Sequence, residues 1–261
     1  MVTDFIFDKV KLSDLGYLLV LDSEEQKDIH QIEYGTIKGS RSDISHKTSY
    51  NYGQNYNTTF MIMKNPCDYG TDELDLTYND IRELTRWLCR KEYKWFKFCK
   101  DDEDDEIWYE VKINTQKEYA GERVIGIKLF VEANSPYGFS KEMEKTYTGT
   151  NFRIKIYSDE EGYIYPDVKV TLTTGGNLML TNTFENRKTI LKNCFGGEVI
   201  TFHGGDTQQI ESTKNHDFIT EFNYQFPRFV NEYDSFENTF TSNLPCTISF
   251  TYREIRKVGM E

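Results

Sequence analysis

The sequence shows no long apolar run, no visible signal-peptide pattern and no surplus of basic residues, and each of these observations argues against a class of protein. The longest apolar run, Tyr17 to Leu21, is far too short to span a bilayer. The start, Met1 to Phe5, has no basic stretch leading into an apolar core, so we expect no signal peptide. Acids outnumber bases by 43 to 31, for a formal net charge of −12, which argues against a nucleic-acid-binding surface. We therefore expect a soluble protein without membrane insertion or specific nucleic-acid binding.

Cysteine pairs and metal-ligand spacings are also missing. The five cysteines are odd in number, include no C-x-x-C pair and are expected to be reduced thiols of a protein folded in a cytoplasm: Cys67, Cys89, Cys99, Cys194 and Cys246. The four histidines are scattered among loop and turn residues and are expected at the surface: His30, His46, His203 and His216. We expect no metal site and no cofactor.

Alanine is scarce, whereas Tyr and Phe are abundant, at 18 each. Chains poor in Ala seldom form helical bundles, and Tyr and Phe favour the half-buried surface of a sheet. At 261 residues the chain is long for one domain and comfortable for two. The composition predicts a mostly β protein of two domains, and it also fits an assembly subunit because these aromatics are common at interfaces.

One helix is expected in the first half of the chain, from an N-cap at Thr77 to basic last turns that reach Lys91. Apolar residues recur at helical spacing along it, at Ile81, Leu84 and Leu88. Thr77 is placed as an N-cap, with Asp80 three residues later as in a capping box. The pattern predicts a helix of about three to four turns.

An acid-tipped hairpin is expected after this helix. The aromatic run from Tyr93 to Phe98 precedes six consecutive acids, Asp101 to Glu106, and a strand that alternates from Ile107 to Ile113 follows. Like charges in a block cannot be buried, so we interpret them as the solvated turn. A calcium loop is the weaker interpretation because the central Gly and the distal Glu are missing. A further strand is expected from Ile125 to Val131.

Ahead of the helix, strands are expected at Phe5–Phe7, Tyr17–Leu21 and Thr59–Met63. Between the last two, residues 35–57 shift to Gly, Ser, Asn, Tyr and charge, and a loop of that length is functional or disordered in most domains. Its tyrosines suggest an arm that becomes ordered against a partner, and a mobile surface loop is the alternative. For intersubunit contact we select residues 39–57, with Tyr50, Tyr52 and Tyr56 as anchors.

The second half, after a junction at Ser135 to Ser140, shows short strands separated by turn signals and no convincing helix. Alternating apolar residues mark strands at 152–156, 168–172, 178–180, 199–203, 218–226 and 248–252. Gly175-Gly176 is interpreted as a two-residue hairpin turn, and Gly196-Gly197 and Gly204-Gly205 as further turns. Such spacing is typical of a β-sandwich or jelly roll. We place the domains at 1–138 and 139–261, and the last strand is left free to pack on either.

Nothing in the sequence supports catalysis. Cys194 lies near His203 in the chain, but no pattern orients them as a pair, and a thiol on an alternating strand usually serves packing. No helix follows the Gly-Gly pairs, so they are not phosphate loops. An aromatic platform for sugar stacking could come from Tyr163, Tyr165 and Tyr233, although packing is the favoured role. We expect no catalytic residues.

The order of these parts resembles the distal tail protein family of long-tailed phages. The resemblance covers nearly the whole chain and rests on the order of several patterns of apolar and turn residues. These patterns lie at 80–88, 108–111, 129–133, 135–138, 197–200, 222–227 and 248–253. It implies a β-rich α+β N-terminal domain with one main helix and a galectin-like C-terminal β-sandwich. The His-Asn-Arg set and stacking Trp of true galectins have no match between residues 141 and 261, so that lectin activity is expected to be lost.

The resemblance implies a hexameric ring at the tip of the tail tube, built by the N-terminal domains. Its implied partners are other copies of the chain, the tail tube protein, the tail-tip hub protein, the tape measure protein and the receptor-binding components. The protein would be assembled in the bacterial cytoplasm and reside at the virion tail tip. The acidic balance suits a channel through which DNA slides. The alternative hypothesis is a free carbohydrate-binding protein that recognises a host surface.

Overall fold

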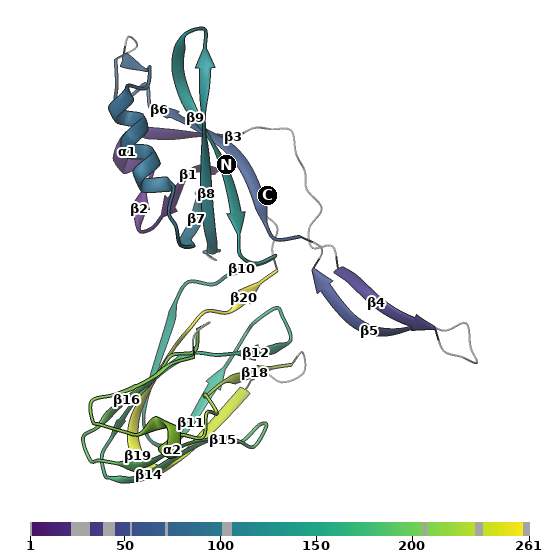
Figure 1. Ribbon diagram of the computed structural model, residues 1–261, viewed down its shortest axis with the longest axis vertical. Helices are drawn as coiled ribbons and strands as arrows, with labels where there is room; N and C mark the ends of the chain where they lie inside the picture. Colours follow the sequence, from purple (N-terminus) through teal and green to yellow (C-terminus); the bar gives the residue numbers. More distant parts are fainter. Residues whose placement is uncertain are drawn as a thin grey trace. The chain divides into compact units, whose positions relative to one another are not determined.

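The structure is a computed structural model that describes residues 2–21, 32–38, 45–52, 54–70, 73–100, 106–205, 208–232 and 237–257 (Figure 1). The chain divides into two compact units. Unit 1 comprises Met1–Phe139 and Lys257–Glu261, and unit 2 comprises Ser140–Arg256. The mostly β prediction is confirmed, because strands dominate both units. Among the described residues, no helix has the length and apolar character needed to cross a membrane.

Unit 1 is built on a seven-stranded antiparallel sheet with the strand order β2-β1-β7-β8-β9-β6-β3. Its strands are β1 (Val2–Phe7), β2 (Val10–Lys11), β3 (Tyr17–Leu21), β6 (Asn57–Lys64), β7 (Lys94–Lys100), β8 (Tyr109–Ala120) and β9 (Arg123–Ala133). The remaining elements are the 3-10 helix η1 (Ser13–Leu15), the helix α1 (Tyr78–Leu88) and the short strand β10 (Gly138–Phe139).

Helix α1 confirms the prediction made from its cap, although it ends at Leu88 and not near Lys91. The Thr77 hydroxyl accepts from the Asp80 backbone N–H at 3.2 Å, and the Asp80 carboxylate accepts from the Thr77 N–H at 2.8 Å, which completes the capping box. Trp87 stacks on Phe5 with 5.8 Å between ring centroids, and its Nε1 donates to the Phe7 carbonyl at 3.2 Å. The helix therefore covers one face of the sheet, and the core lies between them.

The predicted hairpin between β7 and β8 is confirmed, since the two strands pair antiparallel. Residues 101–105 of its acidic block lie outside the described residues. Glu106 at the end of the block accepts from Lys97 Nζ at 2.6 Å.

The prediction of a long loop over residues 35–57 was wrong. Two antiparallel strands, β4 (Ile32–Lys38) and β5 (Ser45–Tyr52), occupy much of it, with Tyr50 opposite Tyr34. These strands could not be predicted from the sequence, because β5 consists of Ser-His-Lys-Thr-Ser-Tyr-Asn-Tyr and has no alternation of apolar and polar residues.

Unit 2 contains a second seven-stranded sheet. Its strands are β11 (Met143–Lys155), β13 (Asp167–Leu172), β14 (Gly176–Asn182), β15 (Arg187–Cys194), β16 (Val199–Phe202), β17 (Ile210–Ser212) and β19 (Glu237–Tyr252). The other elements are β12 (Gly162–Ile164), β18 (Phe229–Asn231), β20 (Ile255–Arg256) and the four-residue helix α2 (Phe218–Glu221).

The long strand β19 joins the two halves of this sheet. It pairs with β14 over 240–242 and with β13 over 246–251, while β11 runs beside it over almost its whole length. Apolar side chains from both halves form one buried cluster, which includes Leu180, Leu191, Val168 and Ile200. The sheet thus bends around a single core, and β19 belongs to unit 2 throughout.

Two expectations for unit 2 were wrong. Gly175-Gly176 does not close a hairpin, because β13 pairs with β16 and β19 while β14 pairs with β15 and β19. A side chain at Gly175 would lie 2.9 Å from the Cys194 carbonyl, so the glycine serves a close backbone approach. Residues 218–226 are also not a strand: α2 occupies their start, and Phe222 and Phe226 reach the core from irregular backbone.

Candidate functional site

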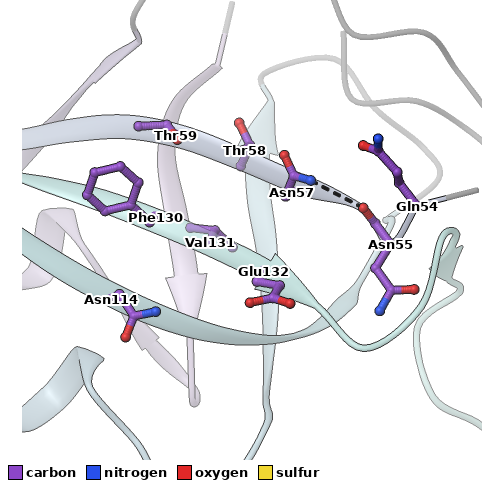
Figure 2. A pocket seen from close by; sticks show the side chains of 9 residues that line it. All are labelled: Gln54, Asn55, Asn57, Thr58, Thr59, Asn114, Phe130, Val131 and Glu132. Atoms are coloured by element: carbon purple, nitrogen blue, oxygen red, sulfur yellow. Dashed lines mark hydrogen bonds between the residues drawn. The ribbon is translucent and has the colours of Figure 1, made fainter.

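The face of the unit 1 sheet that α1 does not cover carries a polar groove over β6, β8 and β9. Gln54 and Asn55 precede β6, and the groove is lined along the strands by Asn57, Thr58, Thr59, Asn114, Phe130, Val131 and Glu132 (Figure 2). Register explains the gathering, since Thr59 and Asn114 both lie opposite Phe130 on β9.

The alternation of β9 decides which side chains face this groove. Leu129 and Val131 are buried, whereas Phe130 remains 39% exposed and Glu132 is exposed. The groove thus presents amides, hydroxyls, one carboxylate and one exposed aromatic ring. The groove could not be found from the sequence, because its residues come from three strands and the segment before β6 and have no common motif.

The arm residues selected from the sequence fall in two places. Tyr50 and Tyr52 lie on β5, and their side chains are outside the described part of the structure. Tyr56 is packed within unit 1, with its ring centroid 4.7 Å from that of Tyr109, and burial raises its pKa. A role for Tyr50 and Tyr52 between subunits stays a prediction, and Tyr56 already has a partner in its own chain.

The tyrosines considered for sugar stacking are engaged with an arginine. The Arg228 guanidinium lies 3.4 Å from the ring centroid of Tyr163 and donates to the Tyr165 hydroxyl at 3.1 Å. Glu185 holds the guanidinium at 3.0 Å from the other side, and this hydrogen bond raises the pKa of Arg228. One face of the Tyr163 ring is therefore occupied, although the side chain is 56% exposed. Tyr233 lies outside the described residues.

The histidine predictions were right for His203 and wrong for His216. The His203 side chain is 36% exposed, 3.9 Å from Asp167 and 3.7 Å from Glu211. The His216 side chain is only 1% exposed and lies between two carboxylates. His30 is outside the described residues, and His46 is on β5, where side chains are not described.

His216 is the centre of a buried charged cluster in unit 2. Its Nε2 lies 2.6 Å from Glu198 Oε1 and its Nδ1 lies 2.6 Å from Glu221 Oε2. Burial by itself lowers the pKa of His216, but the hydrogen bonds and charges of Glu221 and Glu198 outweigh it and raise that pKa. The Asn193 amide and His216 hold the pKa of Glu221 below its ordinary value. When the ring is protonated, each of its two nitrogens can donate to one of these carboxylates.

Cys194 lies beside this cluster and not beside His203. Its thiol donates to the Leu191 carbonyl at 3.3 Å, and burial raises its pKa to about 11. A thiol with so high a pKa is a poor nucleophile. The cluster was not visible from spacing because Glu198 and His216 are 18 residues apart on an irregular path.

Two family models match consecutive parts of the chain. The first, described as a phage tail protein N-terminal domain, matches residues 1–135, and the second, described as a phage tail C-terminal domain, matches residues 137–252. No curated protein matches by sequence.

Solved phage structures share the fold. The chain is similar to the crystal structure of SPP1 Dit (gp 19.1), described as a paradigm of the hub adsorption apparatus in phages that infect Gram-positive bacteria, with a TM-score of 0.66 and 13% identity over 97% of this chain and 99% of that one. A chain of the phage P2 baseplate in its activated conformation with Ca matches with a TM-score of 0.56 and 9% identity, over 99% of this chain and all of the other.

Proposed function

The chain belongs to the phage tail protein family, and we propose that it is a structural hub protein of the tail tip. In this role six copies form a closed ring that joins the tail tube to the host-adhesion components. The observation that carries the proposal is the likeness to SPP1 Dit over nearly the full length of both chains, because it includes both units and not one common domain.

Physical features of unit 1 support self-association. A closed ring of identical chains needs two different surfaces on each copy that fit each other. The uncovered face of the sheet, with its groove and the exposed ring of Phe130, provides one candidate surface. Exposed aromatic residues within polar surroundings are frequent anchors of protein interfaces. Unit 2 is then free to contact the adhesion components.

Light scattering on the purified full-length chain tests the ring. We expect a species of six times the chain mass, alone or in equilibrium with monomer. A chain that stays monomeric at every concentration tested contradicts the proposal.

A matched pair of variants then tests the groove. Phe130→Lys places a charge at the exposed aromatic ring of unit 1 and is expected to shift the equilibrium toward monomer, since aromatic anchors are worth about 2 kcal/mol or more. Tyr224→Lys makes the same change at a residue of unit 2 that is 57% exposed, and it should leave the ring intact. Equal behaviour of the two variants argues against the groove as an interface.

A further inference from the structure

Three potential metal ligands of unit 2 lie together at the turn between β15 and β16. The Sγ of Cys194, a carboxylate oxygen of Glu198 and a ring nitrogen of His216 all lie within 4.8 Å of one another. Glu198 is fully buried, Cys194 is 5% exposed and the His216 side chain is 1% exposed. We propose that these three side chains bind one zinc ion, a role that goes beyond the ring and does not depend on it.

The backbone presents two of the ligands from one tight turn. Gly197 has a φ of +76°, and Phe195 N donates to Glu198 Oε2 at 2.7 Å, so the chain reverses between Cys194 and Glu198. Paired ligands on a turn with two to four residues between them, and a further ligand from a later segment, are typical of zinc sites. His216 supplies that later ligand.

The donor set selects the ion. A thiolate and an imidazole are poor ligands for calcium and magnesium, which take oxygen, but they suit zinc, and a carboxylate completes a common zinc environment. Three protein ligands leave the fourth tetrahedral position to a water molecule.

The neighbours of His216 already have the arrangement that supports a metal-bound histidine. Glu221 Oε2 accepts from Nδ1, and the Asn193 amide donates to the other Glu221 oxygen at 2.7 Å. A carboxylate on the far ring nitrogen fixes the tautomer and turns the near nitrogen toward the metal. Here the near nitrogen is Nε2, which faces Glu198.

The net charge of the cluster is the same with two protons as with one zinc ion. The metal-free cluster is taken with a proton on His216 Nε2, 2.6 Å from Glu198 Oε1, and with a second proton on the Cys194 thiol, which donates to the Leu191 carbonyl. Zinc takes the place of both protons, which leave to solvent, so a doubly charged ion replaces two single charges and the net charge of the buried cluster stays the same. Zinc binding therefore does not add uncompensated charge to the interior.

Cobalt absorption tests the site directly, because Co²⁺ replaces Zn²⁺ and a cobalt–thiolate bond absorbs in the near ultraviolet. We expect the full-length wild-type chain, freed of metal by chelator, to bind about one Co²⁺ with a thiolate-to-cobalt band, and Zn²⁺ to displace it. A wild-type chain that takes up no Co²⁺, or that binds it without a thiolate band, overturns the proposal whatever the variants do.

Variants then assign the ligands. Cys194→Ser should lose the thiolate band, whereas Cys246→Ser, at the other buried thiol of unit 2, should keep it. His216→Gln should lose most of the affinity and His203→Gln none. Glu221→Gln should weaken binding by about 10–100-fold, the effect of losing the carboxylate behind a ligating histidine. A band that survives in Cys194→Ser or disappears in Cys246→Ser assigns the metal elsewhere and overturns the site.

Discussion

The two units differ in where their polar side chains gather, on a sheet face in unit 1 and beside the core in unit 2. In unit 1, α1 covers one face and the other keeps a polar groove with the exposed ring of Phe130. In unit 2 the sheet bends around one core, and three charged side chains, Glu198, His216 and Glu221, meet at its margin. Among the described residues, similar strand content thus yields a sheet face with a polar groove in unit 1 and an internal polar cluster in unit 2.

Probes that separate the units make this comparison testable. All three tryptophans belong to unit 1, at positions 87, 95 and 108, so their fluorescence follows its unfolding. Both cysteines of unit 2 are buried, so their reaction with a thiol reagent follows the opening of that unit.

The largest effect is expected from Phe5→Ala in unit 1. The Phe5 side chain is fully buried and contacts the rings of Trp87, Phe60 and Phe96. Its removal should lower the free energy of unfolding of unit 1 by about 3–5 kcal/mol. The tryptophan transition should move to lower denaturant while the labelling of Cys246 stays unchanged. Equal shifts by both probes would show that the two units unfold together.

The next largest effect is expected from Glu198→Gln in unit 2. It should lower the free energy of unfolding of unit 2 by about 3 kcal/mol, because breaking a buried ion pair leaves a charge without its partner. We place it at the low end of the usual range since Glu221 still pairs with His216. The change should increase the labelling rate of Cys246 in metal-free protein and leave tryptophan fluorescence unaffected. His203→Gln, at a partly exposed ion pair, serves as control and should change the stability by less than about 0.5 kcal/mol.

Asp80→Ala should lower the free energy of unfolding of unit 1 by about 1–2 kcal/mol. The residue completes the capping box of α1 and pairs with Lys64 Nζ at 3.0 Å. Burial by itself raises the pKa of Asp80, but the hydrogen bonds from Thr77 and Lys64 outweigh it and lower that pKa below 3.8. The carboxylate therefore stabilises unit 1 above pH 3.8, and this contribution is lost as the pH falls through the lowered folded-state pKa. Tryptophan-detected stability of wild type and variant should differ at neutral pH and converge in acid.

The smallest effect is expected from Tyr163→Ala in unit 2. It removes the ring on which Arg228 stacks, an exposed cation–π contact worth about 0.5–1 kcal/mol. Glu185 still holds the guanidinium, so the labelling of Cys194 and Cys246 should change little. A loss as large as that of Glu198→Gln would mean that this contact is part of the core of unit 2.

Local signals in the sequence were sufficient for α1 and for the alternating strands. Thr77 and Asp80 are three residues apart, and the apolar period of β8 is visible within one strand. The β4–β5 hairpin was missed because its residues have no apolar alternation, and the role of Gly175 because it depends on a distant backbone, that of Cys194. The burial of His216 depends on Glu198, which reaches it only through the folded chain. Helices and strands can thus be predicted from patterns within a few residues, whereas contacts between distant segments are seen only in the folded structure.

Electron microscopy of the purified full-length chain can show whether six copies form the proposed ring. Averaged images should show closed particles with six copies, with unit 1 of each chain in contact with its neighbours around the ring. Images of dispersed single chains, or of assemblies held together through unit 2 alone, would contradict the account.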